Sequence, residues 1–146
     1  MSAKDILKFM KDKEIEFVDF RFTDPKGKLQ HLTMDATIVD DEMLDKGTFF
    51  DGSSIGGWKA INESDMILKP DLTRAIIDPF NSHNTLNLFC DILDAVKKEP
   101  YERDPRGTAK KAEVYLKKLG IGDKAYFGPE PEFFTFDDVR FENKMN

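Results

Sequence analysis

A charged stretch with two prolines, KKEPYERDPRG at residues 97–107, divides the chain into two unequal parts. Such a stretch is typical of a boundary between folding units, and Asp104 followed by Pro105 supplies the N-cap and first-turn proline of a new helix. The residues before the boundary suffice for one hydrophobic core, whereas those after it are too few to bury a helix and a strand between layers. We therefore predict a complete domain over residues 1–103 and the incomplete beginning of a second over residues 104–146.

The first part opens with signals for a helix and a hairpin. Ser2 is followed three residues later by Asp5, a pairing that resembles a capping box, and apolar side chains then recur at helical spacing. Residues 14–24 instead alternate apolar and polar side chains, and the turn chemistry of DPKGK leads into LQHLTMD at 29–35. We expect an amphipathic helix and then two antiparallel strands.

The rest of the first part adds one short helix and two strands. The sequence VDDEMLDKG predicts a helix over about residues 41–46, closed by Gly47. DMILKPDL at 65–72 and TLNLFCDIL at 85–93 are strand-like runs, and we expect prolines, Pro70 among them, and the polar NSHN to separate them. These elements make up a small α+β unit.

The second part begins with a helix and continues with an aromatic stretch. After Pro105, apolar side chains keep helical spacing as far as Gly120, and YFGPEPEFFTF at 126–136 follows as a predicted strand. A helix followed by a strand is typical of the start of an α/β unit. The apolar stripe of the helix consists of Ala109, Ala112, Tyr115, Leu116 and Leu119.

Charge and cysteine content exclude several classes of protein. The net charge of -6 argues against a nucleic-acid-binding or anionic-membrane surface, because neither polyanion attracts an acidic protein. Cys90 is the one cysteine, so no intrachain disulfide forms, which suits a reducing compartment. The N-terminus is too charged for a signal peptide, and no apolar run approaches the ~18 residues of a membrane span. We expect a soluble, cytoplasmic protein.

Two glutamates, each preceded by a proline, lie among five aromatic residues in the stretch 126–136. On a strand, Glu130 and Glu132 would point to the same side with Cα atoms ~6.6 Å apart. Carboxylates that close repel by ~2.5 kcal/mol at an effective dielectric constant of about 20, and a divalent cation would remove the repulsion. Carboxylate oxygens are ligands that Mg²⁺ and Mn²⁺ prefer, which predicts metal binding. Ordinary ion pairs or a solvated face are the main alternative, and a glycosidase-type acid pair is a third.

The glycine-rich stretch DGSSIGGW at 51–58 is a second candidate site. Its glycines match neither G-x-x-x-x-G-K-[ST] nor G-x-G-x-x-G, so a phosphate-binding loop is unsupported. One interpretation is a local turn that Asp51 opens, with Trp58 covering core. The other is a mobile loop that presents Asp51 to a ligand, with Gly56 and Gly57 as hinges. Composition does not choose between them.

Taken together, DGSSIGGW and FGPEPEFF at 127–134 resemble the N-terminal part of bacterial-type glutamine synthetase. The resemblance extends along the whole chain, through residues 66–71 and PYERDPRG at 100–107. It implies an α+β fold, in which a β-grasp-like N-terminal domain precedes a larger catalytic α/β domain with a curved antiparallel sheet. Residues 104–146 resemble only the beginning of that catalytic domain.

The resemblance also implies roles for five residues. Glu132 is similar to a ligand of the metal ion on the glutamate and ammonium side of the site, and Glu130 to a ligand of the ion that holds the ATP phosphates. The aromatic neighbours would form a dry wall around them. Asp51 resembles the residue that accepts a proton from ammonium, with Ser54 nearby, and Asp65 resembles a further acid of the same region.

The implied enzyme uses Mg²⁺ or Mn²⁺ and ATP to phosphorylate the side-chain carboxylate of glutamate, and ammonia then displaces the phosphate. In this family the loop with Asp51 comes from the adjacent subunit. The resemblance therefore implies a ring-shaped homo-oligomer, a dodecamer, with intersubunit active sites. Because most of the site would lie beyond Asn146, we expect the isolated chain to be inactive and to bind metal weakly.

Two other functions stay open at this point. A related ligase could join glutamate to an organic amine, although Asp51 in an intact DGSS favours ammonium. Alternatively, residues 1–103 could act as a non-catalytic β-grasp interaction module. His31 and His83 match no family motif and are expected to be surface or packing residues.

Overall fold

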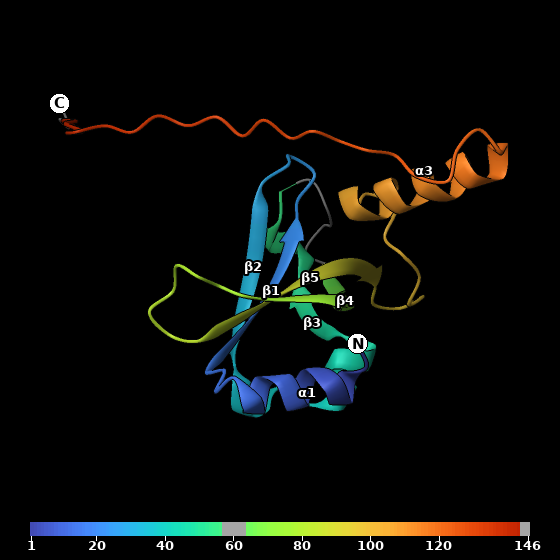
Figure 1. Ribbon diagram of the computed structural model, residues 1–146, viewed down its shortest axis with the longest axis horizontal. Helices are drawn as coiled ribbons and strands as arrows, with labels where there is room; N and C mark the ends of the chain where they lie inside the picture. The colour runs from blue at the N-terminus through green and yellow to red at the C-terminus, as the bar shows by residue number, and fades with distance from the viewer. Residues whose placement is uncertain (57–63, 144–146) are drawn as a thin grey trace.

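A five-stranded mixed sheet organises the first ninety-odd residues of the computed structural model, which describes residues 1–56 and 64–143 (Figure 1). The elements in chain order are α1 (Ala3–Asp12), β1 (Phe17–Thr23), β2 (Leu29–Asp35), the short helical turn η1 (Ala36–Ile38), α2 (Asp41–Lys46), β3 (Thr48–Asp51), the turn η2 (Gly52–Ser54), β4 (Asp65–Ile77), β5 (Thr85–Asp94) and α3 (Pro105–Leu119). The predicted helices, the hairpin and the small α+β unit are all confirmed.

The strand order is β2-β1-β5-β4-β3. The central pair, β1 and β5, is parallel, and the other neighbours are antiparallel. The tight β1–β2 turn is held by Asp24, whose Oδ1 accepts hydrogen bonds from the backbone N–H groups of Lys26 and Lys28 at 2.9 Å each. Aspartate at the start of such a turn satisfies donors that the hairpin leaves unpaired, as its turn chemistry predicts.

One face of the sheet carries the core, which α1 and α2 cover. In α1 the predicted capping box is present, and Ala3, Ile6 and Met10 form its buried stripe. In α2 the helix ends at Gly47, as predicted, with a φ of 91° that favours glycine. The side chains with no exposed surface are Ile6, Val18, Phe20, Leu44, Met66, Leu68, Leu86, Leu88 and Ile92.

The expectation that Pro70 separates two strands is wrong. β4 runs through Pro70, which pairs with Cys90 of β5, and the register shifts between Pro70 and Ala75. The neighbour on the other side, β3, reaches only as far as Leu68, so one side of Pro70 needs no ladder donor. A proline is tolerated in a strand at such an unpaired edge.

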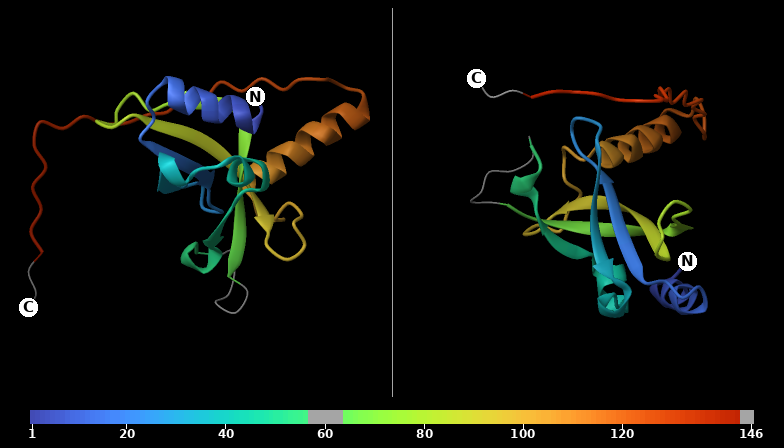
Figure 2. Two further views of the ribbon diagram at one scale, coloured as in Figure 1. Left: turned by 90° about the horizontal axis from the view of Figure 1, so that it is seen from below. Right: turned by 90° about the vertical axis from the view of Figure 1, so that its left-hand side faces the viewer.

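The first turn of α3 is attached to the end of β5. Asp104 is the predicted N-cap and accepts from the backbone N–H of Arg106 at 3.0 Å. Its second oxygen accepts from the backbone N–H of Ile92 in β5 at 3.1 Å, and the side chain is 1% exposed. Arg106 donates to Asp91 at 2.8 Å and pairs with Asp71. Figures 1 and 2 show α1 and α3 on opposite sides of the sheet.

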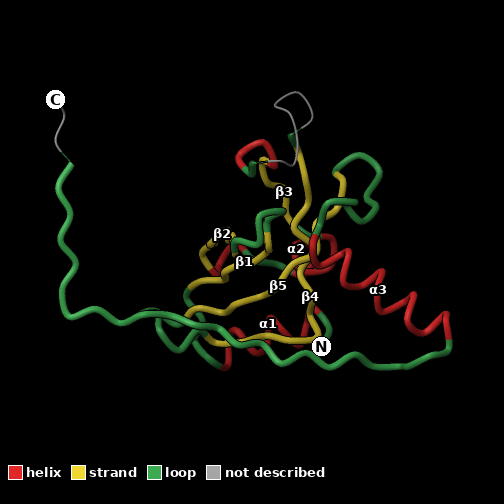
Figure 3. The backbone as a smooth tube through the Cα atoms, turned by 90° about the horizontal axis from the view of Figure 1, so that it is seen from above, coloured by secondary structure: helices red, strands yellow, loops and turns green. Residues whose placement is uncertain are grey.

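The stretch that follows α3 has no regular secondary structure over residues 123–143, and Figure 3 draws it as loop. The strand predicted at 126–136 is therefore absent from the described structure. Every residue from 123 to 143 is exposed, including Tyr126 at 89% and Phe134 at 86%. An extended segment becomes a strand only when a neighbour accepts its backbone hydrogen bonds, and these residues pair with none of β1–β5. Over the described residues, no helix is long and apolar enough to cross a membrane.

Candidate functional site

The turn that ends β3 carries Asp51, one of the predicted site residues. Its Oδ1 accepts hydrogen bonds from the Ser53 hydroxyl at 2.7 Å and from the Ser53 backbone N–H at 2.8 Å. These two bonds hold the pKa of the Asp51 carboxyl below its ordinary value. Asp51 is exposed. The arrangement presents an ionised carboxylate to solvent on a backbone fixed by its own turn, which is the local-turn geometry considered from the sequence.

Gly52 anchors this turn to β4. Its backbone N–H donates to the Ser64 carbonyl at 2.7 Å. A Cβ at this position would lie 2.4 Å from the sulfur of Met66, which is fully buried. Only glycine fits here without moving a core side chain. Gly52 therefore fixes the position of the preceding residue, Asp51, relative to β4.

Asp65 lies directly opposite Asp51. The two are register partners on β3 and β4, and both are exposed. Side chains of directly opposed residues approach to about 5 Å between Cβ atoms, and like charges there repel. The structure therefore brings two predicted acids together into a patch of negative charge that would attract a cation. Ser54 ends the turn three residues after Asp51 and is exposed. Gly57 and Trp58 lie outside the described residues.

Glu130 and Glu132 do not join this patch. Both are exposed on the stretch after α3, which passes well away from the end of β3 (Figure 2, left). The dry aromatic wall expected around them is also absent: Phe127 and Phe133 are 89% and 83% exposed. Aromatic rings become dry only when apolar groups cover them. Phe134 and Phe136 contact each other, with ring centroids 6.2 Å apart, but both stay exposed.

The described residues do not form a complete metal site. Across residues 1–56 and 64–143, no three histidine, cysteine, aspartate or glutamate side chains are grouped closely enough to hold an ion. Mg²⁺ requires six oxygen ligands in near-octahedral geometry. Glu130 and Glu132 could supply two of them, so they fit a metal only as part of a larger donor set.

Sequence reasoning missed a buried polar network on the sheet face opposite the core. Asp19 is 4% exposed and accepts from Arg21 at 2.7 Å and from Thr33 at 2.7 Å, with His31 Nδ1 at 2.8 Å. The expectation that His31 is a surface or packing residue is confirmed, since its side chain is exposed, and it also pairs with Asp19. The alternation of residues 17–23 places Asp19 on this face, but its partner on β2 depends on the hairpin register.

Comparison with known families covers both parts of the chain. The sequence model described as glutamine synthetase, beta-Grasp domain, matches residues 14–95. The one described as glutamine synthetase, catalytic domain, matches residues 102–146. The β-grasp fold predicted for the N-terminal part is thereby confirmed.

Curated relatives give the same result. The chain is 62% identical over 141 residues to a glutamine synthetase of Rhizobium meliloti (strain 1021), which covers 97% of the chain and 30% of the relative. Over all 146 of its residues, the chain is 54% identical to the glutamine synthetase of Escherichia coli (strain K12), and it covers 31% of that relative. The chain thus spans about three tenths of the length of these relatives.

Solved structures share the fold. The glutamine synthetase of Plasmodium falciparum, determined by cryoEM, superposes with a TM-score of 0.73 at 25% identity, covering 82% of this chain and 23% of that one. A structure titled "Apo GmaS without ligand" superposes with a TM-score of 0.71 at 22% identity, covering 80% of this chain and 27% of that one. The second likeness concerns the fold alone.

Proposed function

The chain belongs to the glutamine synthetase family, and we propose that it is the N-terminal part of an ATP-dependent ligase that makes glutamine from glutamate and ammonium through a γ-glutamyl phosphate. The observation that carries this proposal is the 54–62% identity to bacterial glutamine synthetases along nearly the whole chain. Because the chain spans only about three tenths of those relatives, the reaction is proposed for a longer polypeptide that contains it. We place the domain boundary between residues 103 and 104.

Asp51 is proposed to bind ammonium and accept its proton, since only neutral ammonia can attack the acyl phosphate. Its support is the turn geometry: the carboxylate is exposed, ionised and held by Ser53. Asp65, its register partner, adds negative charge that favours a cation at the same place. Ser54 is proposed to line the site from the same turn.

Glu130 and Glu132 are proposed as two of the metal ligands, for Mg²⁺ or Mn²⁺. Such ions, when bound, neutralise the charge on the transferred phosphoryl group of ATP. The two glutamates are exposed, and the residues that the structure describes do not complete a donor set around them.

We also propose that one active site combines Asp51 of one copy with the glutamates of another. The separation between the β3 turn and the stretch after α3 supports this arrangement, because the two groups do not converge within one chain (Figure 2). A ring-shaped homo-oligomer, proposed as a dodecamer, would bring them together by repeating one heterologous interface. The cytoplasm is the compartment we propose.

The experiment compares the longer polypeptide with the isolated chain. We expect the longer enzyme to form glutamine from ATP, glutamate and ammonium, and the isolated chain to form none. In the longer enzyme, D51N should lower kcat/KM by about a hundredfold or more, because a positioned proton acceptor contributes roughly that factor. The matched control, D12N on the exposed surface of α1, should leave it unchanged.

Glutamine formation by the isolated chain would contradict the proposal, as would full activity of D51N and E132Q in the longer enzyme. The second result would favour a non-catalytic interaction module instead. Assaying the longer enzyme with ammonium and with polyamines separates the ammonium-dependent ligase from one that uses an organic amine.

A further inference from the structure

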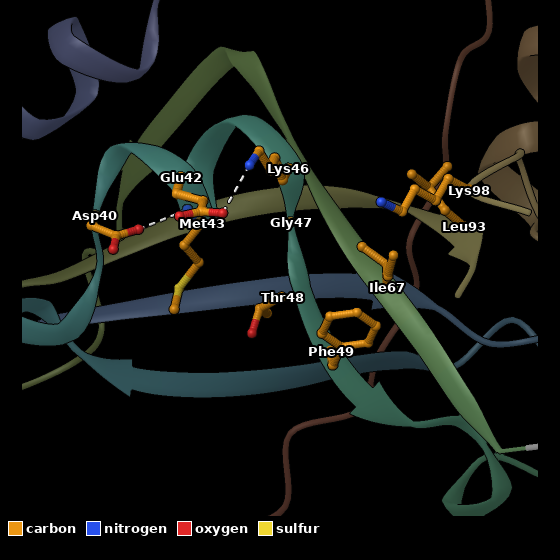
Figure 4. A pocket seen from close by; sticks show the side chains of 10 residues that line it. All are labelled: Asp40, Glu42, Met43, Lys46, Gly47, Thr48, Phe49, Ile67, Leu93 and Lys98. Atoms are coloured by element: carbon orange, nitrogen blue, oxygen red, sulfur yellow. Dashed lines mark hydrogen bonds and ion pairs between the residues drawn. The ribbon is translucent and has the colours of Figure 1, made fainter. Parts of the chain in front are cut away.

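A pocket of about 540 Å³ opens where α2 leads into β3 (Figure 4). Its floor is a row of apolar side chains on three neighbouring strands: Phe49 on β3 pairs with Ile67 on β4, which pairs with Leu93 on β5. Ile67 is 5% exposed, but Phe49 is 64% exposed. The pocket therefore leaves an aromatic ring in water beside a closed apolar floor, and the volume lies in the range of sites for small ligands.

The charged groups at the rim leave one cation without a partner. Asp40 is the N-cap of α2 and accepts from the backbone N–H of Met43 at 2.8 Å, and within α2 Glu42 pairs with Lys46 at 2.8 Å. Among the residues that the structure describes, the ammonium of Lys98 has no hydrogen-bond or ion-pair partner. Figure 4 shows this ammonium turned toward the middle of the pocket. Asp40 and Glu42 keep their negative charges, so the rim as a whole is neutral, and the Lys98 ammonium is the group left to pair with the carboxylate of a ligand.

The backbone holds Lys98 in place. Its φ of 57° is uncommon for any residue other than glycine and costs free energy. The conformation is fixed by a hydrogen bond from the Lys98 N–H to the Asp94 carbonyl at 2.8 Å. Asp94 Oδ1 also accepts from the backbone N–H groups of Val96 and Lys97 at 3.0 Å each. Strained positions of this kind gather at ligand-binding sites, because the surrounding structure must enforce them.

We propose that this pocket binds a small organic acid, whose carboxylate pairs with Lys98 and whose aromatic or branched aliphatic body lies on Phe49, Ile67 and Leu93. None of the residues proposed for the ligase reaction lines this pocket, so a test of the pocket does not test that reaction. Phe49 lies two residues before Asp51 on β3, which places the bound acid beside the candidate site.

The first test varies the head group of the ligand. The isotope-labelled chain is titrated, by NMR, with phenylpropanoate, phenylpropanamide and phenylpropylamine, which share one body and carry negative, neutral and positive heads. We expect the acid to shift the backbone amides around Phe49, Ile67 and Lys98 and to bind roughly two- to fivefold more tightly than the amide, the amine being weakest. Equal affinities, or shifts confined to other parts of the sheet, would overturn the proposal.

The second test varies the protein. F49A should weaken phenylpropanoate binding about tenfold, because the ring supplies most of the apolar contact, and K98M about threefold. The matched controls are F80A, whose ring is 95% exposed outside this pocket, and K97M, which removes the neighbouring ammonium; both should bind like the parent chain. All four positions are exposed, and unchanged amide shifts elsewhere confirm the fold.

A different outcome would assign the pocket to another partner. If the chain self-associates with rising concentration, F49A abolishes the association and phenylpropanoate does not bind, then the pocket is a contact between copies. That result would overturn the proposal. Sedimentation velocity over a range of concentrations provides this measurement.

Discussion

The sheet domain and the stretch from α3 onward share the same helix-capping signals, but only the sheet domain buries its apolar side chains. Each begins with a capped helix, α1 after Ser2 and α3 after Asp104. The apolar stripe of α1 is buried, whereas α3 leaves Tyr115 60% and Leu119 49% exposed. Caps act within one turn of backbone, so they define a helix wherever they occur. Burial depends on a partner surface, which α1 has in the sheet.

The need for a partner is greater for strands than for helices. The hairpin of β1 and β2 forms because the chain itself supplies both partners across one turn. The extended stretch around Glu130 is rich in aromatic residues but has no neighbouring backbone to pair with among the described strands. A helix satisfies its hydrogen bonds internally, and a strand cannot.

The largest expected difference between the two regions is in the free energy of unfolding when an apolar side chain is truncated in each. Leu88 lies on the central strand β5 with no exposed surface, and L88A should lower the free energy of unfolding by about 2–5 kcal/mol. F133A removes a larger side chain, but that ring is 83% exposed, so the change should be within about 0.5 kcal/mol. Urea unfolding followed by circular dichroism measures both. A comparable loss in F133A would show that the aromatic stretch packs in solution.

Acid sensitivity should also separate the two regions. Burial would raise the pKa of Asp19, but hydrogen bonds from Arg21, Thr33 and His31 outweigh it and hold that pKa below its ordinary value. A carboxyl with a lowered pKa stabilises the fold above its unfolded pKa of about 3.9, and this stabilisation is lost as the pH falls through the folded pKa. D19N should cost about 1–3 kcal/mol at pH 7 and flatten the acid side of the stability curve.

The control for this experiment lies in the other region. Asp137 is exposed on the stretch after α3, and D137N should reproduce the parent curve of unfolding free energy against pH. If D19N also followed the parent curve, the network around Asp19 would not be the source of the acid sensitivity.

The smallest expected effects come from the helix caps. S2A removes the N-cap of α1, and the global free energy of unfolding should fall by about 1 kcal/mol because α1 is part of the core. G120A places a side chain at a φ of 67° at the end of α3, at a local cost of about 1 kcal/mol. G120A should shorten α3, seen by amide hydrogen exchange in its last turn, without moving the urea midpoint. A shifted midpoint would mean that α3 unfolds together with the sheet.

Most of the fold was predictable because its signals are local. Ser2, Gly47 and Gly120 end or begin helices by bonds within a few residues, and the structure places them there. Pro70 was misread because its tolerance depends on β3 ending at Leu68, which is a fact about the neighbouring strand.

The candidate site was predictable to a smaller degree. The turn chemistry around Asp51 is local and was considered from the sequence, whereas its pairing with Asp65 depends on the register of β3 on β4. The network of Asp19 with His31 and the pocket beside Phe49 likewise depend on which strands become neighbours. Spacing along the chain does not contain that information.

Because Asp104 attaches the start of α3 to β5, a change in the angle of α3 at that point would displace the far end of the helix most. Its near end is tied to the backbone of Ile92, and its fifteen residues extend about 22 Å from that pivot at 1.5 Å each. A tilt of about 5° at the pivot would therefore move the far end, at Leu119, by about 2 Å. The residues that follow Leu119 would move with it, so a small change in angle at Asp104 would become a displacement of atomic size at the far end of α3.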